Sequence, residues 1–407
     1  MYTLAAVAAD VMDMKAAAVA DVTTAVAKAD VMKTAIVILN WNTEGFLGKF
    51  LPVLLDSVNN LDGVEVIVAD NDSSDGSMQL MQDRFPHVRT IEFDNNLGFT
   101  GGYNKAFEEV VTKAGANAPE YFLLMNSDIE VPQGWYEPLV NWMDSHPECA
   151  ACAPKLHSWH DREMFEYAGA AGGYIDSFGF PFCRGRILKR IAQDSGQFDH
   201  MNPEVFWASG ACLMIRSRVY QDLGGLDPRF FAHMEEIDMC WRMQLAGYKI
   251  CVVPESTVYH VGGGTLPASS PFKLFLNYRN NLLMMDNNLA GTFALKHYKD
   301  GMDALKAAHK GIEEAADLIR LRMLIDLASS MVYLITLRFK AFSAVIKAHK
   351  GFRKLRRKKD ADSIAAYLSS GTKGEVNHIY GAWIIGRSIL YRNKIFDIIH
   401  ERDFFKF

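Results

Sequence analysis

Hydrophobic and polar positions alternate in blocks over residues 34–126, and the blocks have two different periods. Short apolar runs such as AIVILN and VEVIVAD are typical of buried strands. The stretches between them repeat their apolar residues at helical spacing. Strands that alternate with helices in this way predict βαβ crossovers and a parallel sheet, so the predicted fold class is α/β. The predicted strands are 35–40, 64–70, 87–93 and 121–126, and the predicted helices are 44–58 and 100–114.

The rest of the chain divides into a second mixed block and a helical part. Strand-like pieces flank a Gly-rich, Arg-containing middle, and a helical pattern begins near Glu235. We expect an Ala-rich extension without chemistry over 1–33, one α/β domain over 34–290 and a helical C-terminal region over 291–407. The strand-like pieces are 149–153, 205–215 and 249–259, the helical stretches are 272–289 and 293–349, and a tail runs to Phe407.

Composition narrows the class of protein. The chain has 407 residues, 49% of them hydrophobic and 22% charged, which is typical of a soluble globular protein with a sizeable core. Its net charge of −5 does not indicate a general nucleic-acid binder, so no nucleic-acid partner is expected. The six cysteines include one C-x-x-C pair, Cys149 and Cys152, without the second pair of a zinc set. Because the N-terminal residues also lack the basic start of a signal peptide, we expect a cytoplasmic enzyme with reduced cysteines.

One segment departs strongly from the average charge. Residues 335–359 hold ten Lys or Arg and no acid, whereas acids outnumber bases in the rest of the chain. The apolar stretch Met323–Leu337 contains Asp326 and is too short to cross a bilayer core of about 30 Å. Four apolar residues from Phe339 to Ile346 lie at helical spacing among the basic ones. This pattern predicts an in-plane helix on an anionic membrane surface, peripheral on the inner face of the cytoplasmic membrane, or else an ordinary packed helix with a solvated basic end.

Polar clusters follow three of the predicted strands directly. Ligands of parallel α/β sheets bind beyond the carboxyl ends of the strands, so we expect these clusters at one edge of the sheet. Short acceptors such as Asp70 can bind ribose hydroxyls there, although an Asx turn that caps the next helix explains the same residues. A dinucleotide oxidoreductase is disfavoured because the first turn, Trp41–Gly45, lacks G-x-G-x-x-G. The clusters are Asn40-Trp41-Asn42, Asp70-Asn71-Asp72 and Asn126-Ser127-Asp128.

Three further features have the chemistry of a reactive centre. Asp128 at a strand end suits a hard divalent cation held against a pyrophosphate, whereas a lone Asp is more often a turn residue. His260 precedes a run of glycines, where a metal ligand beside a mobile loop competes with a structural His. Glu235, Glu236 and Asp238 fall within four positions at a predicted helix start, where capping is one explanation. Repulsion between adjacent carboxylates also raises the pKa of one of them and suits it to proton abstraction.

These clusters, in this order and spacing, resemble the family 2 glycosyltransferases of GT-A fold, most closely their rhamnosyltransferase-like branch. The likeness runs from about Ala35 to Asn288 and implies a Rossmann-like mixed sheet with helices on both faces, followed by a helical region. Asn126-Ser127-Asp128 takes the place of the D-x-D motif, and Glu235-Glu236-Ile237-Asp238 that of the E-D-x-D base motif. The other matching segments are Ile36–Asn42, Val68–Ser77, Asn95–Asn104 and Trp207–Ala211.

The resemblance implies an inverting glycosyltransferase of bacterial surface polysaccharide synthesis, with a nucleotide-diphosphate sugar as donor and a glycan or lipid-linked acceptor. Asp128 and His260 would hold Mg²⁺ or Mn²⁺, and Glu236 would be the general base beside Glu235 and Asp238. By analogy the donor is expected to be dTDP-rhamnose or a UDP-hexose. The implied nucleotide-binding residues are Asn40, Asn42, Asp70, Asp72, Asn96, Asn104, Asn126 and Ser127, and candidates for the acceptor or diphosphate are Arg184, Arg186, Trp207 and Ser209.

Two other functions stay open at this point. A sugar-phosphate nucleotidyltransferase would need a Gly-rich, basic first loop for a triphosphate, and residues 41–49 offer only Lys49. A polysaccharide-binding scaffold without activity would not need both Asp128 and the carboxylates near residue 235. Glycosyl transfer therefore fits the pattern best.

Overall fold

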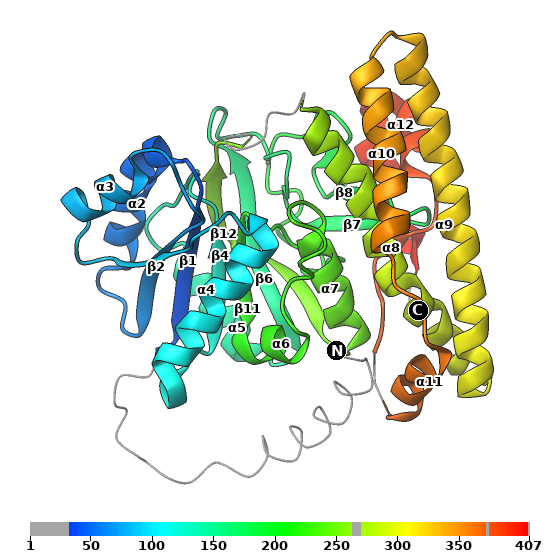
Figure 1. Ribbon diagram of the computed structural model, residues 1–407, viewed down its shortest axis with the longest axis horizontal. Helices are drawn as coiled ribbons and strands as arrows, with labels where there is room; N and C mark the ends of the chain where they lie inside the picture. Colours follow the sequence, from blue (N-terminus) through cyan, green and yellow to red (C-terminus); the bar gives the residue numbers. More distant parts are fainter. Residues whose placement is uncertain (1–31, 263–269, 372–373, 406–407) are drawn as a thin grey trace.

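An eight-stranded sheet runs through the first 260 residues of the computed structural model, which describes residues 32–262, 270–371 and 374–405 (Figure 1). The predicted extension over 1–33 therefore lies almost entirely outside the described residues. The strand order is β3-β2-β1-β4-β11-β6-β12-β5. The strands are β1 (Thr34–Asn40), β2 (Val64–Asp70), β3 (Arg89–Glu92), β4 (Tyr121–Met125), β5 (Ile129–Glu130), β6 (Cys149–Ser158), β11 (Cys212–Arg216) and β12 (Lys249–His260).

Six of these strands run in the same direction. β1 pairs in parallel with β2 and β4, and β2 pairs in parallel with β3. β11 is antiparallel to both β4 and β6, so β6 and its parallel neighbour β12 run the same way as β1. The carboxyl ends of these six strands therefore share one edge of the sheet. This confirms the predicted mixed α/β sheet and places its polar clusters together.

Helices cover both faces of the sheet. Alternate residues of β1 enter different cores: Ala35 and Val37 belong to one cluster, and Ile36 and Ile38 belong to the other. Strands buried on both faces read as continuous apolar runs, which is why β1 and β2 show no polar alternation in the sequence. α2, α3 and α5 pack on one face, and α4 and α7 pack on the other. The helices are α2 (Glu44–Val58), α3 (Ser77–Arg84), α4 (Gly98–Ala114), α5 (Tyr136–Ser145), α6 (Ser217–Asp222) and α7 (Glu235–Leu245).

A second sheet joins the Gly-rich middle to the end of the chain. β7 pairs antiparallel with β8 and parallel with β13, a strand of the predicted tail. The sequence analysis predicts no strand in this tail, because strands of two residues have no detectable period, yet the tail supplies β13 and β14 to the sheet. This sheet has β7 (Gly173–Asp176), β8 (Pro181–Cys183), β9 (Arg186–Ile187), β10 (Arg190–Ile191), β13 (Ile379–Tyr380) and β14 (Phe404–Phe405), and the tail also forms α11 (Ala361–Ser369) and α12 (Ile384–Tyr391).

Three long helices stand beside the main sheet (Figure 1): α8 (Pro271–Lys299), α9 (Ala304–Ile335) and α10 (Phe339–Leu355). The sequence predicts a break near residue 290, but α8 continues through it and ends at Lys299. A Cβ on Gly311 of α9 would lie 2.6 Å from the Ala290 carbonyl oxygen, so close helix packing explains that glycine. The predicted domain boundary at residue 290 falls inside α8. No helix among the described residues is long and apolar enough to cross a membrane.

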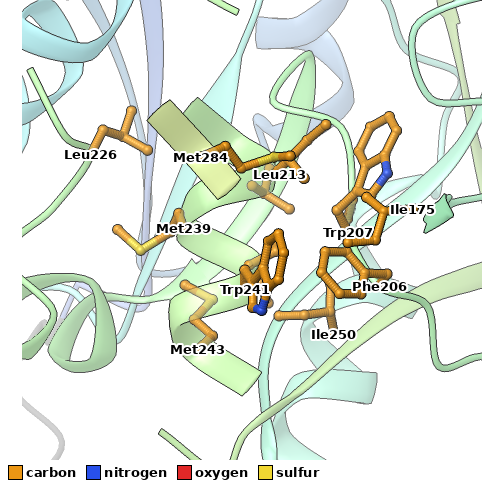
Figure 2. Close-up of a cluster of buried hydrophobic side chains, with 14 of the residues drawn as sticks. Ile175, Phe206, Trp207, Leu213, Leu226, Met239, Trp241, Met243, Ile250 and Met284 are labelled. Atoms are coloured by element: carbon orange, nitrogen blue, oxygen red, sulfur yellow. The ribbon is translucent and has the colours of Figure 1, made fainter. Parts of the chain in front are cut away.

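The core around α7 ties α8 to the sheet. Figure 2 shows Met239, Trp241 and Met243 of α7 among Phe206, Trp207, Leu213, Ile250 and Met284 of neighbouring elements. The Trp241 indole N–H donates to the Thr292 hydroxyl at 2.9 Å, so its buried polar atom is satisfied. α8 is therefore part of the same hydrophobic core as the sheet.

Candidate active site

The loops after β1 and β2 are bonded to each other at the sheet edge. Asn40 Nδ2 donates to Asp70 Oδ1 at 2.7 Å, and the other Asp70 oxygen accepts from the Ser73 backbone N–H at 2.9 Å. Asn42 has a left-handed φ of 53°, and its side-chain oxygen accepts from the Ser74 N–H at 2.7 Å. Each carboxylate oxygen of Asp70 accepts one of these bonds and keeps capacity for another. Asp72, also left-handed, is exposed beside them.

Asn96 and Asn104 both serve the backbone of this region. Asn96 Oδ1 accepts from the Gly98 N–H at 2.8 Å and from Asn71 Nδ2 at 3.1 Å. Asn104 donates to the Leu226 carbonyl at 2.7 Å, and its oxygen accepts from Tyr220 and from the Leu226 N–H. Because these bonds use both ends of its amide, Asn104 joins α4 to the loop at 226 and does not fit the nucleoside-binding role expected of it.

Asp128 and His260 meet at the carboxyl ends of β4 and β12. Asp128 Oδ1 lies 3.2 Å from His260 Nε2, and its second oxygen accepts from the Gly262 N–H at 3.1 Å. Asn126 Nδ2 lies 3.4 Å from the same imidazole nitrogen. Asp128 lies in a turn, as a lone Asp often does, but it is only 7% exposed, and the neighbouring Ser127 is also buried. The glycines that follow, 263–264, lie outside the described residues.

Glu166, which the sequence did not single out, completes this group. Its Oε2 lies 3.3 Å from His260 Nδ1, so the imidazole sits between two carboxylates. Burial lowers the pKa of His260, but hydrogen bonds and charges from Asp128 and Glu166 raise it to about 10. Burial raises the pKa of Asp128, but His260 outweighs it, so that pKa lies below its usual value. An acid within the apolar stretch 164–173 was the only sequence signal for Glu166.

The donor set fits a divalent cation only in part. No group of three or more His, Cys, Asp or Glu side chains that could hold a metal occurs within the described ranges. Asp128 and His260 offer one oxygen and one nitrogen, and Mg²⁺ sites commonly take one or two carboxylates and fill the rest with phosphate oxygens and water. A cation there would have to displace the imidazolium proton that the two carboxylates favour. These two residues therefore fit a metal that binds together with a diphosphate.

A strained loop places the second group of carboxylates. Phe231, His233 and Met234 have φ values of 65°, 71° and 74°, and a non-glycine residue in this region costs about 1–3 kcal/mol. Asn280 of α8 donates to the carbonyls of Phe230, Ala232 and His233 at 2.7–2.9 Å, which holds the loop in that shape. Helix α7 then begins at Glu235, as predicted.

Glu235 and Glu236 differ from Asp128 in having no cationic partner. Among the described residues, the Oε2 atom of each has no hydrogen-bond donor. Burial raises the pKa of Glu236 to about 7, and burial followed by the Glu236 charge raises the pKa of Glu235 well above its usual value. Glu236 packs beside Gly210, where an added Cβ would lie 3.5 Å from its own Cβ. A carboxylate with a pKa near 7 can accept a proton from a hydroxyl at neutral pH.

Asp238 braces the helix start. Its carboxylate pairs with Arg242 at 2.8 Å and accepts from the amides of Asn287 and Asn288 at 2.8 and 2.9 Å. It is fully buried. These partners occupy the carboxylate and leave it to position α7, the bracing role that the helical geometry predicts for it.

The residues expected to bind acceptor or diphosphate have mostly structural partners. The Trp207 indole is buried in the core of Figure 2 and donates to the Tyr174 carbonyl at 3.0 Å. Arg184 bonds to the Tyr174 hydroxyl and the Asn202 carbonyl, beside a separate cavity of about 430 Å³ that β14 also lines. Both therefore fail to fit that role. Arg186 and Ser209 bond to the carbonyls of Tyr167 and Ala168, next to Glu166, and stay near the candidate site.

The chain is similar in sequence to a known protein family and to several named relatives. Residues 35–224 match the family model described as glycosyl transferase family 2, which confirms the resemblance seen in the sequence. An N-acetylglucosaminyl-diphospho-decaprenol L-rhamnosyltransferase of Mycobacterium tuberculosis is 28% identical over 205 residues, 48% of this chain and 66% of that protein. The rhamnosyltransferase WbbL of Escherichia coli K12 is 24% identical over 228 residues, 55% of this chain and 82% of that protein. The chain thus spans just under two thirds of the mycobacterial relative's length.

Solved structures were also compared. GalNAc-T7 with UDP, GalNAc and Mn²⁺ has a TM-score of 0.48 at 15% identity, covering 74% of this chain and 58% of that one. TarS of S. aureus, residues 1–349, has a TM-score of 0.44 at 13% identity, covering 81% of this chain and 93% of that one. Both scores are below 0.5, so the GT-A architecture assigned to the chain rests on its own mixed sheet and on the family match.

Proposed function

We propose that the chain transfers a sugar from a nucleotide-diphosphate donor to a glycan or lipid-linked acceptor, with inversion, because residues 35–224 match the family model of glycosyl transferase family 2. One observation carries the proposal. Asp128 is paired with His260 and has a lowered pKa, whereas Glu236 has no cationic partner among the described residues and has a pKa raised to about 7. A direct displacement needs both, because one end must bind a charged leaving group and the other must remove a proton.

The donor would lie along the carboxyl ends of β1, β2 and β4. Asp70 and Asp72 present acceptor oxygens for the nucleoside, and Asn40 orients Asp70 through its 2.7 Å hydrogen bond. The names of the relatives support a deoxyhexose donor such as dTDP-rhamnose, with a UDP-hexose as the alternative. Asn126 and Ser127 lie between this nucleoside region and Asp128, so we keep them as donor contacts.

The Asp128–His260 pair and Glu236 have different roles in this mechanism. Asp128 and His260 would hold Mg²⁺ or Mn²⁺, which when bound supplies positive charge against the leaving diphosphate. Glu236 takes the proton from the acceptor hydroxyl as that hydroxyl attacks the anomeric carbon. Asp238 and Arg242 fix the helix that carries Glu236, and Glu235 beside it raises the electrostatic cost of a second negative charge.

The acceptor and the place of action follow from the same relatives. The mycobacterial relative is named for a lipid-linked acceptor, which supports a polyprenyl diphosphate sugar here. We propose work in surface polysaccharide synthesis, peripheral on the cytoplasmic face of the membrane and without a nucleic-acid partner. A nucleotidyltransferase fits less well, because Lys49, the cation of the first loop, lies 3.6 Å above the Trp159 ring, away from a triphosphate.

The proposal is tested by incubating the full chain with dTDP-rhamnose or a UDP-hexose, Mg²⁺ and a short-chain polyprenyl diphosphate N-acetylglucosamine. We expect acceptor-dependent release of the nucleoside diphosphate and a glycosylated lipid of inverted configuration. Release of pyrophosphate from a nucleoside triphosphate and a sugar phosphate would instead show a nucleotidyltransferase. If the donor binds but no nucleoside diphosphate is released when donor and acceptor are both present, glycosyl transfer is contradicted.

A further inference from the structure

The second half of α9 presents an apolar face to solvent. Its outward residues fall within an arc of about 140° at 100° per residue, and two further apolar residues follow, Leu337 in the turn and Phe339 at the start of α10. Ile335 and Leu337 are 76% and 73% exposed, which is unusual for side chains of this size. The α9 apolar face, as we name it, consists of Leu321, Leu324, Leu327, Met331, Val332, Ile335, Leu337 and Phe339.

Every charge within this stretch is turned inward. Between residues 321 and 337 the charged residues are Arg322 and Asp326, which are 4% and 1% exposed and pair with each other at 3.0 Å. Arg322 also donates to the Phe178 carbonyl at 3.2 Å, and His349 of α10 lies 3.5 Å from Asp326. The outer side of α9 therefore carries no charge over about 25 Å of helix and turn. A helix side that faces only water would not be stabilised by exposing apolar residues and burying its charged ones.

Cations flank the face on one side. Arg338 and Lys340 are exposed directly after it, and exposed Lys and Arg continue along α10. The exposed acids of α9, Glu313 and Asp317, lie in its first half instead. The sequence prediction places the lipid-facing residues on α10, but Val345 is fully buried in the helix bundle and Phe342 and Ile346 are half-buried, so of that stripe Phe339 alone is exposed. The exposed apolar surface therefore belongs to α9 and the turn, next to the α10 cations.

The fold brings this face to the side where the candidate site opens. β12 ends at His260 on the edge shared by the parallel strands, and α8 begins eleven residues later, at Pro271, and runs back along the sheet. α9 packs against α8 and returns, so its second half ends toward the same side (Figure 1). A surface that holds the membrane there would hold it near the carboxyl ends of the strands.

We propose that the α9 apolar face inserts into one leaflet of an anionic bilayer, with Arg338, Lys340 and the α10 cations on the lipid headgroups. Interfacial helices of this kind combine a buried apolar face with basic flanks. The charge pattern favours lipid over a second copy of the chain, because a self-complementary interface would place these cations against each other. The proposal rests on the lipid-linked acceptor proposed above, since only such an acceptor needs the site held at a membrane.

The first experiment is co-sedimentation of the full chain with phosphatidylcholine vesicles, with and without phosphatidylglycerol. The wild type is expected to bind the anionic vesicles, and the Ile335→Asp/Leu337→Asp variant is expected to bind at least about tenfold more weakly, because two inserted side chains become charged. Val53→Asp changes an exposed apolar residue of α2 and is the matched control, which should bind as the wild type does. Equal binding by the double variant would overturn the insertion and leave adsorption through basic residues.

The second experiment reports insertion directly. Leu337→Cys and Val53→Cys are each labelled with the fluorophore NBD, which is selective here because the six native cysteines are buried. The label at 337 should shift to the blue with anionic vesicles, and the label at 53 should not. Light scattering without vesicles tests the other occupant: a wild-type dimer that the double variant abolishes, without vesicle binding, would overturn the proposal in favour of a second copy.

The two proposals fail in distinguishable ways. Nucleoside diphosphate release is measured for the same variants with a short-chain acceptor that does not need a bilayer. Wild-type release without vesicle binding overturns the lipid surface alone. Vesicle binding without any release supports the surface and contradicts glycosyl transfer.

Discussion

Two carboxylates of the candidate site, Asp128 and Glu236, lie in opposite electrostatic surroundings. Asp128 lies against an imidazole whose pKa is raised to about 10, so the pair is an ion pair. Glu236 lies beside another carboxylate, and burial raises its own pKa to about 7. Burial raises the pKa of both carboxylates, but at Asp128 the neighbouring imidazolium outweighs burial, whereas Glu236 has no such charge beside it among the described residues. Under the proposed function, Asp128 would hold a cation and Glu236 would take up a proton.

The largest effect should come from the cation-holding region. Asp128→Asn, or removal of divalent cations with EDTA, should lower turnover by about 10⁴-fold, since a bound metal supplies several kcal/mol of transition-state stabilisation. Adding Mg²⁺ or Mn²⁺ back should restore the wild type and not the variant, as measured by nucleoside diphosphate release. Asp62→Asn, an exposed carboxylate before β2, is the control. Full activity in EDTA would contradict a role for a divalent cation at Asp128.

Loss of the proton acceptor should be the next largest effect. Glu236→Gln should keep donor and metal binding but lower kcat by roughly 10²–10⁴-fold, the usual contribution of a general base. Glu235→Gln is the matched variant and should stay within about tenfold of wild type. If the two losses were exchanged, the base would be Glu235.

The pH dependence of kcat/KM should show the ionisation of Glu236, with a change of about tenfold per pH unit below its pKa. Glu236 must be ionised to accept a proton, so kcat/KM should fall below pH 7 and level off above it. Stability has the opposite sign: the folded pKa lies above the usual 4.5, so the folded state holds more protons between pH 4.5 and 7 and stability declines as pH rises. The melting temperature of Glu236→Gln should therefore gain on wild type over that window. A constant difference would contradict the raised pKa.

The smallest effect on turnover should come from Asp238, which positions helix α7. Asp238→Asn loses its pairing with Arg242 and should lower the free energy of unfolding by about 1–3 kcal/mol, measured in urea. Activity should fall less than about tenfold because the residue positions the helix only. Asp317→Asn breaks an exposed ion pair with Arg320 and should change stability by under about 1 kcal/mol.

Local pattern made much of the fold predictable. The bounds of α2 match the prediction, and those of β1 and β2 match within a residue, because their signals lie within one stretch of sequence. The carboxylate clusters were predictable for the same reason. Glu166 was not, because only the path of the chain after β6 brings it to His260. The burial of Asp128 was missed because Gly262, 134 residues away, covers it.

Other errors have a common physical origin in partners supplied from a distance. Arg184 looks like a free loop cation in the sequence, yet a tyrosine hydroxyl and backbone carbonyls satisfy it. The apolar stripe of α10 looks lipid-facing, yet α8 and α9 cover it. Sequence periodicity shows which face of a helix is apolar, and only the packed structure shows what that face meets.

The three hydrogen bonds from Asn280 to the loop before α7 have a consequence for protein engineering. A version of the chain shortened to its sheet, ending before α8, would lack the amide that holds Phe230, Ala232 and His233. The loop would keep the hydrogen bond from the Thr100 N–H to the Phe231 carbonyl, but without the Asn280 amide we expect its three left-handed residues to relax. Minimal catalytic fragments and chimeras of this chain must therefore carry α8 with the sheet, even though the family match ends at residue 224.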